Sequence, residues 1–142
     1  MERLGGNKMP YIKVWIHLIW TTKNRYPYLK KSLRIRLIHH IRENAISKGI
    51  CIDFINGAED HIHILLRLKA EQSIANIVKL IKGESSYWVN QKKWFTTKFE
   101  WQRDYYAISH NSKYIKKIRE YIKNQDTHHQ LKNLPTDLKD KK

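Results

Sequence analysis

The amino-acid sequence predicts a single domain of the α+β class, with a ferredoxin-like, split βαβ fold whose antiparallel central sheet carries helices mainly on one face. Segments with a two-residue hydrophobic period alternate with segments of helical spacing, in the order strand, helix, strand, strand, helix, strand or strands, helix. The chain has 142 residues, of which 41% are hydrophobic, so it is long enough to bury a core. We find no internal repeat or linker, and we expect residues 1–142 to form one domain with an ordered core of about 11–130.

The first predicted strand spans residues 11–22 and carries large side chains on both faces, which is typical of a central strand covered on both sides. The polar, basic segment 21–27 has the composition of a turn. Ser32 is expected to cap the helix that follows, which runs to about residue 48 and ends at Gly49.

Residues 50–58 and 60–68 both have strand-like patterns, and the short turn between them predicts a hairpin. Ser73 is expected to cap a long helix over 73–91. Because glycine destabilises a helix interior, Gly83 predicts a kink or the close approach of another backbone.

The last third of the chain is expected to hold one or two strands and a helix. Residues 94–111 are rich in aromatic and polar side chains and predict strands with a break near 102–104. The final helix begins near residue 111 and reaches Gln125. The polar tail from residue 127 is expected to fray.

The charge balance predicts a polyanionic partner. Lys and Arg number 28 against 13 Asp and Glu, which gives a net charge of +15, and a surplus of this size on a small domain is the electrostatic signature of nucleic-acid binding. A membrane surface is disfavoured because the basic residues are spread along the chain. The sequence has no signal peptide, no span of about 20 apolar residues, and a single cysteine, Cys51, so we expect a cytoplasmic protein.

The run from Asp60 to Leu68 contains two histidines with strand spacing. His61 and His63 share one parity, and the isoleucines and leucines at 62, 64, 66 and 68 share the other. The aliphatic residues should therefore face a core and both histidines the opposite side. Residues i and i+2 of a strand lie about 7 Å apart on one face, close enough for two imidazoles to bind one cation.

Five stretches, in order and spread over about residues 11–130, together resemble a known family: Trp15–Arg25, His61–His63, Leu80–Ser86, Trp101–Ser109 and Tyr121–His129. The chain resembles the small single-tyrosine HUH transposases of bacterial insertion sequences (the TnpA type), which move as single-stranded DNA. REP-associated tyrosine transposases are close relatives of this family.

The resemblance implies a transposase with a metal-dependent site. Tyr121 matches the nucleophile, which would cleave single-stranded DNA and form a 5′-phosphotyrosine. His61, His63 and Gln125 match the protein ligands of a divalent cation. Imidazole nitrogens plus an amide oxygen suit Mg²⁺ or Mn²⁺, and the i, i+4 spacing of Tyr121 and Gln125 places both on one side of a helix.

The same resemblance implies the partners: single-stranded DNA with hairpin ends, and a second copy of the chain in a homodimer whose tyrosine helices are exchanged between subunits. Base stacking on aromatic rings and phosphate contacts from basic side chains are how single strands are held. The residues expected to contact DNA are Lys23, Arg25, Lys82, Ser85 and Arg103.

Several alternatives remain open at the level of sequence. Tyr105, Tyr106 and Tyr114 compete with Tyr121 for the nucleophile, and His17 is either a core histidine or a hydrogen-bond partner near the metal. The adjacent pair at 128–129 is disfavoured as a metal site because neighbouring helical residues point about 100° apart. The competing functions are a domesticated REP-associated nuclease acting on chromosomal palindromes, a non-catalytic nucleic-acid-binding module and, less well matched in length, a replication initiator or relaxase.

Overall fold

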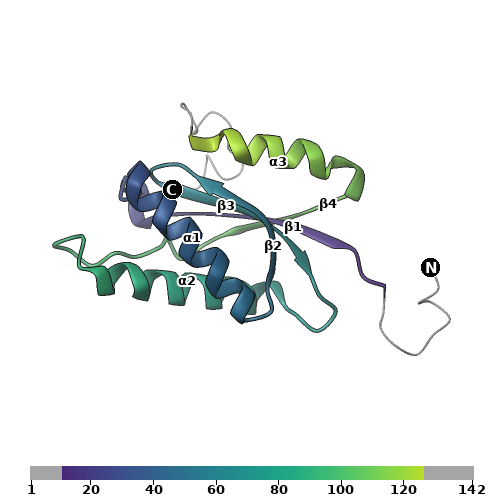
Figure 1. Cartoon of the computed structure of the whole chain (residues 1–142), viewed down its shortest axis with the longest axis horizontal. Helices are drawn as coiled ribbons and strands as arrows, with labels where there is room; N and C mark the ends of the chain where they lie inside the picture. Colours follow the sequence, from purple (N-terminus) through teal and green to yellow (C-terminus); the bar gives the residue numbers. More distant parts are fainter. Residues whose placement is uncertain (1–10, 127–142) are drawn as a thin grey trace.

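An antiparallel sheet forms the centre of the computed structural model, which describes residues 11–126 (Figure 1). Its strands are β1 (Val14–Thr21), β2 (Cys51–Gly57), β3 (His61–Leu68) and β4 (Tyr106–His110), in the spatial order β2-β3-β1-β4. The α-helices of the described part are α1 (Lys31–Ser47), α2 (Ile74–Lys92) and α3 (Ile115–Lys123). Short 3₁₀ turns occupy Lys23–Arg25, Ser112–Tyr114 and Asn124–Asp126. The α+β class and the split βαβ arrangement predicted from the sequence are confirmed.

The two faces of the sheet are covered by different helices. Helices α1 and α2 lie on one side of the sheet and α3 lies alone on the other (Figure 1). The larger core joins α1 and α2 to the even-numbered residues of β1 and β3, among them Leu18, Trp20, Ile62 and Ile64. Hydrophobic burial of these residues follows directly from the period of two, because alternate side chains point to opposite faces.

The smaller core lies under α3. Ile115 and Ile122 of the helix are buried against Trp15 of β1 and Leu65 of β3. Leu65 points to the same face of the sheet as His61 and His63, because the three residues have the same parity on β3. Helix α3 therefore packs on the histidine face. The packing of α3 therefore places its C-terminal end over the histidine pair.

The helix ends partly follow the sequence prediction. Ser73 caps α2, its hydroxyl accepting a hydrogen bond from the Asn76 amide at 3.1 Å. Gly49 adopts a positive φ of 73° just beyond α1, as a helix-terminating glycine does. The predicted Ser32 cap is wrong: α1 begins at Lys31, and Lys30 precedes it without a side-chain cap.

One further expectation is corrected. The expected close approach of a backbone at Gly83 is not found, because a Cβ added there would meet nothing within 4 Å. In the region 94–111, where one or two strands were expected, the structure has one strand, Tyr106–His110, and an isolated bridge between Trp101 and Thr22 before the expected break. The tail from residue 127 lies outside the described residues, and among residues 11–126 no helix is long and apolar enough to cross a membrane.

Gly57 ends β2 where the chain turns toward His61, and a Cβ there would lie 2.4 Å from the His61 carbonyl oxygen. We therefore expect Gly57→Ala to lower the free energy of unfolding by about 1–3 kcal/mol, since the β2–β3 turn would have to shift. Gly83→Ala is the matched control: it is helical and unobstructed, so it should raise the free energy of unfolding by about 0.5–1 kcal/mol. Urea unfolding of both variants measures this, and equal effects would contradict it.

Candidate active site

The four residues predicted to form the catalytic centre come together where β3 meets the C-terminal end of α3. His61 and His63 are fully buried on β3, and their ring centroids lie 5.1 Å apart. Gln125, also fully buried, places Oε1 3.1 Å from Nε2 of His61. The ring of Tyr121 meets the His63 ring edge to face, with centroids 5.5 Å apart.

The orientation of the Gln125 amide is fixed from its other end. Its Nε2 donates a hydrogen bond to the Tyr121 carbonyl oxygen at 3.2 Å. The amide oxygen is therefore the atom that faces His61, because a flipped amide would bring two oxygens together. Gln125 presents an acceptor to the histidine pair.

His63 is oriented by a histidine on the neighbouring strand. Nε2 of His17 lies 2.8 Å from Nδ1 of His63. Both roles considered for His17 therefore hold: it is buried in the protein, and it forms a hydrogen bond next to the histidine pair. The other ring nitrogen of His63, Nε2, is buried without a hydrogen-bond partner in the described chain. Burial, followed by the neighbouring His61 and His17, holds the pKa of His63 well below its ordinary value, so the ring is neutral.

A divalent cation fits the donor set. An orphaned buried ring nitrogen of His63, the His61 Nε2 atom and an amide oxygen are the kinds of atoms that bind Mg²⁺ or Mn²⁺ with positions left for substrate. Within residues 11–126 no three His, Cys, Asp or Glu side chains are grouped to hold a metal ion. The third ligand that the resemblance implies is the Gln125 amide, and its Oε1 atom lies 3.1 Å from Nε2 of His61.

Tyr121 is distinguished from the other tyrosines by its neighbours. Its ring is half-buried and contacts both His63 and His17. Burial raises the pKa of the Tyr121 phenol, and a side-chain hydrogen bond with Gln125 partly offsets this. Of the competitors, Tyr114 is 47% exposed, and Tyr105 and Tyr106 pack against the larger core and Ile19, respectively. The histidines at 128 and 129 lie outside the described residues.

Three of the five predicted DNA contacts lie on two adjoining loops. The amides of Lys23 and Gln102 donate to the carbonyl oxygens of Glu100 and Thr21 at 3.0 and 2.8 Å, which joins the segment after β1 to the segment before β4. Lys23 and Arg103 are exposed on these loops. Arg25 reaches Asp60, its Nε lying 3.2 Å from Oδ2. These basic residues therefore lie at the end of the sheet from which β3 begins.

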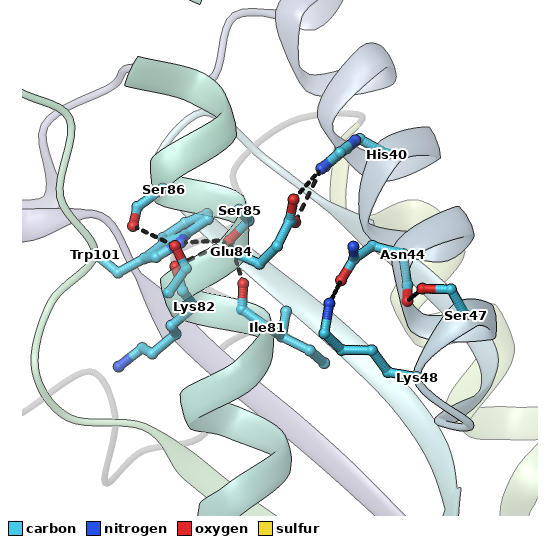
Figure 2. Close-up of polar contacts among 11 residues, drawn as sticks. His40, Asn44, Ser47, Lys48, Ile81, Lys82, Glu84, Ser85, Ser86 and Trp101 are labelled. Atoms are coloured by element: carbon cyan, nitrogen blue, oxygen red, sulfur yellow. Dashed lines mark hydrogen bonds and ion pairs between the residues drawn. The ribbon is translucent and has the colours of Figure 1, made fainter. Parts of the chain in front are cut away.

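The other two predicted contacts, Lys82 and Ser85, hold the fold together. Ser85 is fully buried, and its hydroxyl donates to the Ile81 carbonyl at 2.6 Å and accepts from the Trp101 indole at 2.9 Å (Figure 2). The prediction that Ser85 contacts DNA is therefore wrong, because such a contact needs an exposed hydroxyl. Nζ of Lys82 donates to the carbonyl oxygens of residues 102, 103 and 104 at 2.6–3.1 Å. Burial lowers the pKa of Lys82 to about 8, and its donors are occupied.

Sequence reasoning missed Asn56 of β2. Its Nδ2 donates to the carbonyl oxygens of Ile122 and Lys123, at 3.2 and 2.9 Å, at the end of α3. Asn56 lies opposite His63 in the pairing of β2 with β3. Its side chain therefore connects the sheet beside His63 to the end of α3, the helix that carries Tyr121. In the sequence, an asparagine before a glycine predicts only a turn. No sequence signal indicates that Asn56 binds the last carbonyl groups of α3.

A family model described as "Transposase IS200 like" matches residues 11–125, and the chain belongs to this family. It is similar to the ISDra2 transposase TnpA of Deinococcus radiodurans, with 33% identity over 70 residues, covering 49% of this chain and 50% of that protein. The match thus spans half the length of this curated relative.

Two solved structures are similar. A crystal structure from Deinococcus radiodurans R1, described as a transposase, shares 26% identity with a TM-score of 0.63 and covers 87% of this chain and 98% of its own. A REP-associated tyrosine transposase bound to a REP hairpin has a TM-score of 0.60 at 16% identity, covering 83% of this chain and 68% of its own. The second likeness supports the fold alone.

The buried His17 predicts a pH dependence of stability. Burial, followed by the nearby His110, lowers the pKa of His17 from 6.5 to about 3. The unfolded chain therefore binds more protons than the folded chain between these values, and stability must fall as the pH drops through this window, by roughly 1 kcal/mol per pH unit for one such histidine.

Urea unfolding of the metal-free protein at pH 7 and pH 5 tests this, with His17→Phe as the comparison. We expect the wild type to lose more stability than the variant over this interval. The same loss in both proteins would show that His17 is not held neutral by the fold.

Proposed function

We propose that this chain is a single-tyrosine HUH transposase that cleaves and rejoins single-stranded DNA through a 5′-phosphotyrosine, with Mg²⁺ or Mn²⁺ held by His61, His63 and Gln125. The observation that carries this proposal is the convergence of Tyr121 and Gln125 on the buried histidines His61 and His63. Family membership over residues 11–125 supports the same reading.

The chain's own groups suggest the course of the reaction. The Tyr121 phenol, whose pKa is raised by burial, must lose its proton to attack the phosphorus. The new bond joins Oη to phosphorus, the P–O3′ bond breaks, and the released 3′ oxygen takes up a proton. Attack by a 3′-OH on the phosphotyrosine reverses these changes and rejoins DNA. A bound divalent cation would supply charge stabilisation for the phosphate oxygens.

Charge and neighbouring loops support single-stranded DNA as the substrate. The chain carries a net charge of +15, and Lys23, Arg25 and Arg103 lie on the loops that adjoin the start of β3. The similar REP-associated tyrosine transposase was solved with a REP hairpin, and hairpin-bearing ends are the form that we propose this chain recognises. We place this activity in the cytoplasm.

We also propose that the active form is a homodimer. The contacts of α3 with the sheet, including the Asp53–Arg119 ion pair at 2.6 Å, lie within one chain. Exchange of α3 between two copies would preserve the same contacts in trans. The molar mass in solution, with and without hairpin DNA, distinguishes one copy from two.

Two other functions are compatible with part of these observations. A domesticated REP-associated nuclease would use the same site on chromosomal palindromes, and the DNA flanking the gene discriminates: hairpins at both ends of a short element favour the mobile form. A non-catalytic binding module would use the charge alone, and it predicts the same hairpin affinity with and without Mn²⁺ and no covalent product.

Incubation with labelled hairpin-bearing single strands and Mn²⁺, followed by a denaturing gel, tests the chemistry. We expect a protein–DNA adduct with the wild type and none with Tyr121→Phe, because phenylalanine lacks the attacking oxygen. Tyr114→Phe is the control, since this exposed residue lies on the turn just before the same helix; it should retain the adduct.

Hairpin binding, measured separately, should be the same for both variants. An adduct that persists in Tyr121→Phe would refute Tyr121 as the nucleophile. Absence of any adduct from the wild type, with binding indifferent to Mn²⁺, would favour the non-catalytic module.

A further inference from the structure

We propose that Asp60 and Arg25 are positioning residues that fix the tautomer of His61, so that its Nε2 atom presents a lone pair to the proposed metal. The assignment of that metal rests on the proposed function. The tautomer itself is a property of the folded, metal-free chain and can be measured independently.

The first step is the contact between adjacent side chains. Nδ1 of the fully buried His61 lies 2.8 Å from Oδ1 of Asp60. A carboxylate only accepts hydrogen bonds, so Nδ1 carries the proton and, in the neutral ring, Nε2 does not. Nε2 is the atom that lies 3.1 Å from Oε1 of Gln125, and the Gln125 amide is oriented by its bond to the Tyr121 carbonyl.

This arrangement brings two acceptors together. When the ring is neutral and its proton is on Nδ1, the lone pair of His61 Nε2 faces an amide oxygen, which is unfavourable unless a cation or a second ring proton lies between the two atoms. Without Asp60, the neutral ring would prefer the other tautomer, in which Nε2–H donates to Gln125. The carboxylate therefore opposes a local hydrogen bond and favours a ligand geometry, as outer partners of metal-binding histidines do.

Arg25 holds the second oxygen of the same carboxylate. Its Nε lies 3.2 Å from Oδ2 of Asp60, so the two carboxylate oxygens are divided between arginine and histidine. Arg25 has a φ of +58° and the preceding Asn24 a φ of +57°; this left-handed conformation is common for asparagine but uncommon for a residue such as arginine.

The surroundings of this segment are well defined. Thr22 is fully buried; its hydroxyl donates to the Tyr26 carbonyl at 2.6 Å, and its amide donates to the Asp60 carbonyl at 2.9 Å. The Asn24 amide donates to Oε1 of Gln102 at 3.2 Å. The loop is thus tied to the turn that carries Asp60, and in this conformation the Arg25 guanidinium lies beside the Asp60 carboxylate.

The experiment compares Asp60→Ala with Glu59→Ala. Glu59 is the matched control because it is adjacent, has the same charge and pairs with the exposed Lys30 at 3.1 Å. The ¹⁵N spectra of histidine-labelled, metal-free protein at pH 8 report the tautomer. We expect the Nδ1–H form of His61 in the wild type and in Glu59→Ala, and the Nε2–H form in Asp60→Ala.

The affinity for Mn²⁺, followed by electron paramagnetic resonance, is the second readout. We expect Asp60→Ala to bind Mn²⁺ about 10–100-fold more weakly than the wild type, Glu59→Ala to bind as the wild type does, and Asp60→Asn to recover part of the loss because its amide oxygen still accepts. Arg25→Gln should weaken Mn²⁺ binding to a smaller extent. If Arg25 only contacts DNA, this variant will lose hairpin affinity and keep the wild-type Mn²⁺ affinity.

An unchanged His61 tautomer in Asp60→Ala would overturn the inference, whatever the activity. So would equal Mn²⁺ affinities of the Asp60 and Glu59 variants. A wild type that binds no Mn²⁺ and forms no adduct would instead refute the proposed function, and the tautomer measurement alone would then decide the role of Asp60. Circular dichroism of each variant checks that it is folded.

Discussion

The packing of α3 on the sheet is the interaction on which the site depends. Ile115 and Ile122 bury their side chains against Trp15 and Leu65, and this apolar contact is what brings the polar groups near the C-terminal end of the helix to the histidines of β3. Burial of a helix face is non-directional and supplies most of the stabilisation. The capping contact of Asn56 with the last carbonyl groups of α3 adds direction.

Desolvation of the histidines is the electrostatic consequence of that packing. A buried imidazole is disfavoured in its charged form, so His17 and His63 have lowered pKa values and remain neutral. Neutral imidazole is the form that ligates a metal. The burial that attaches α3 therefore also keeps His63 neutral, and the Nε2 atom of His63 is buried without a hydrogen-bond partner among the described residues.

The residues predicted to contact DNA have different surroundings in the fold. Lys82 and Ser85 looked like DNA contacts because they lie in a polar, family-like stretch of α2, yet their side chains bind carbonyl groups and the Trp101 indole and so secure the approach to β4. Lys23 and Arg103 remain exposed on the adjoining loops. Residue type alone could not separate these cases, because a lysine next to solvent and a lysine that binds carbonyl groups have the same local sequence pattern.

The sequence by itself determined the order of elements, the division of β3 into an aliphatic face and a histidine face, and the family, because these depend on local periodicity and on matching stretches. Tertiary structure decided that α3 covers the histidine face alone, that Ser85 is buried, and that Asp60 lies between His61 and Arg25. These outcomes depend on contacts between distant residues, such as the bond from Asn56 to Lys123, which are 67 positions apart. They depend on which surfaces become buried together, and that information is carried by the packing of the whole chain and not by any one segment.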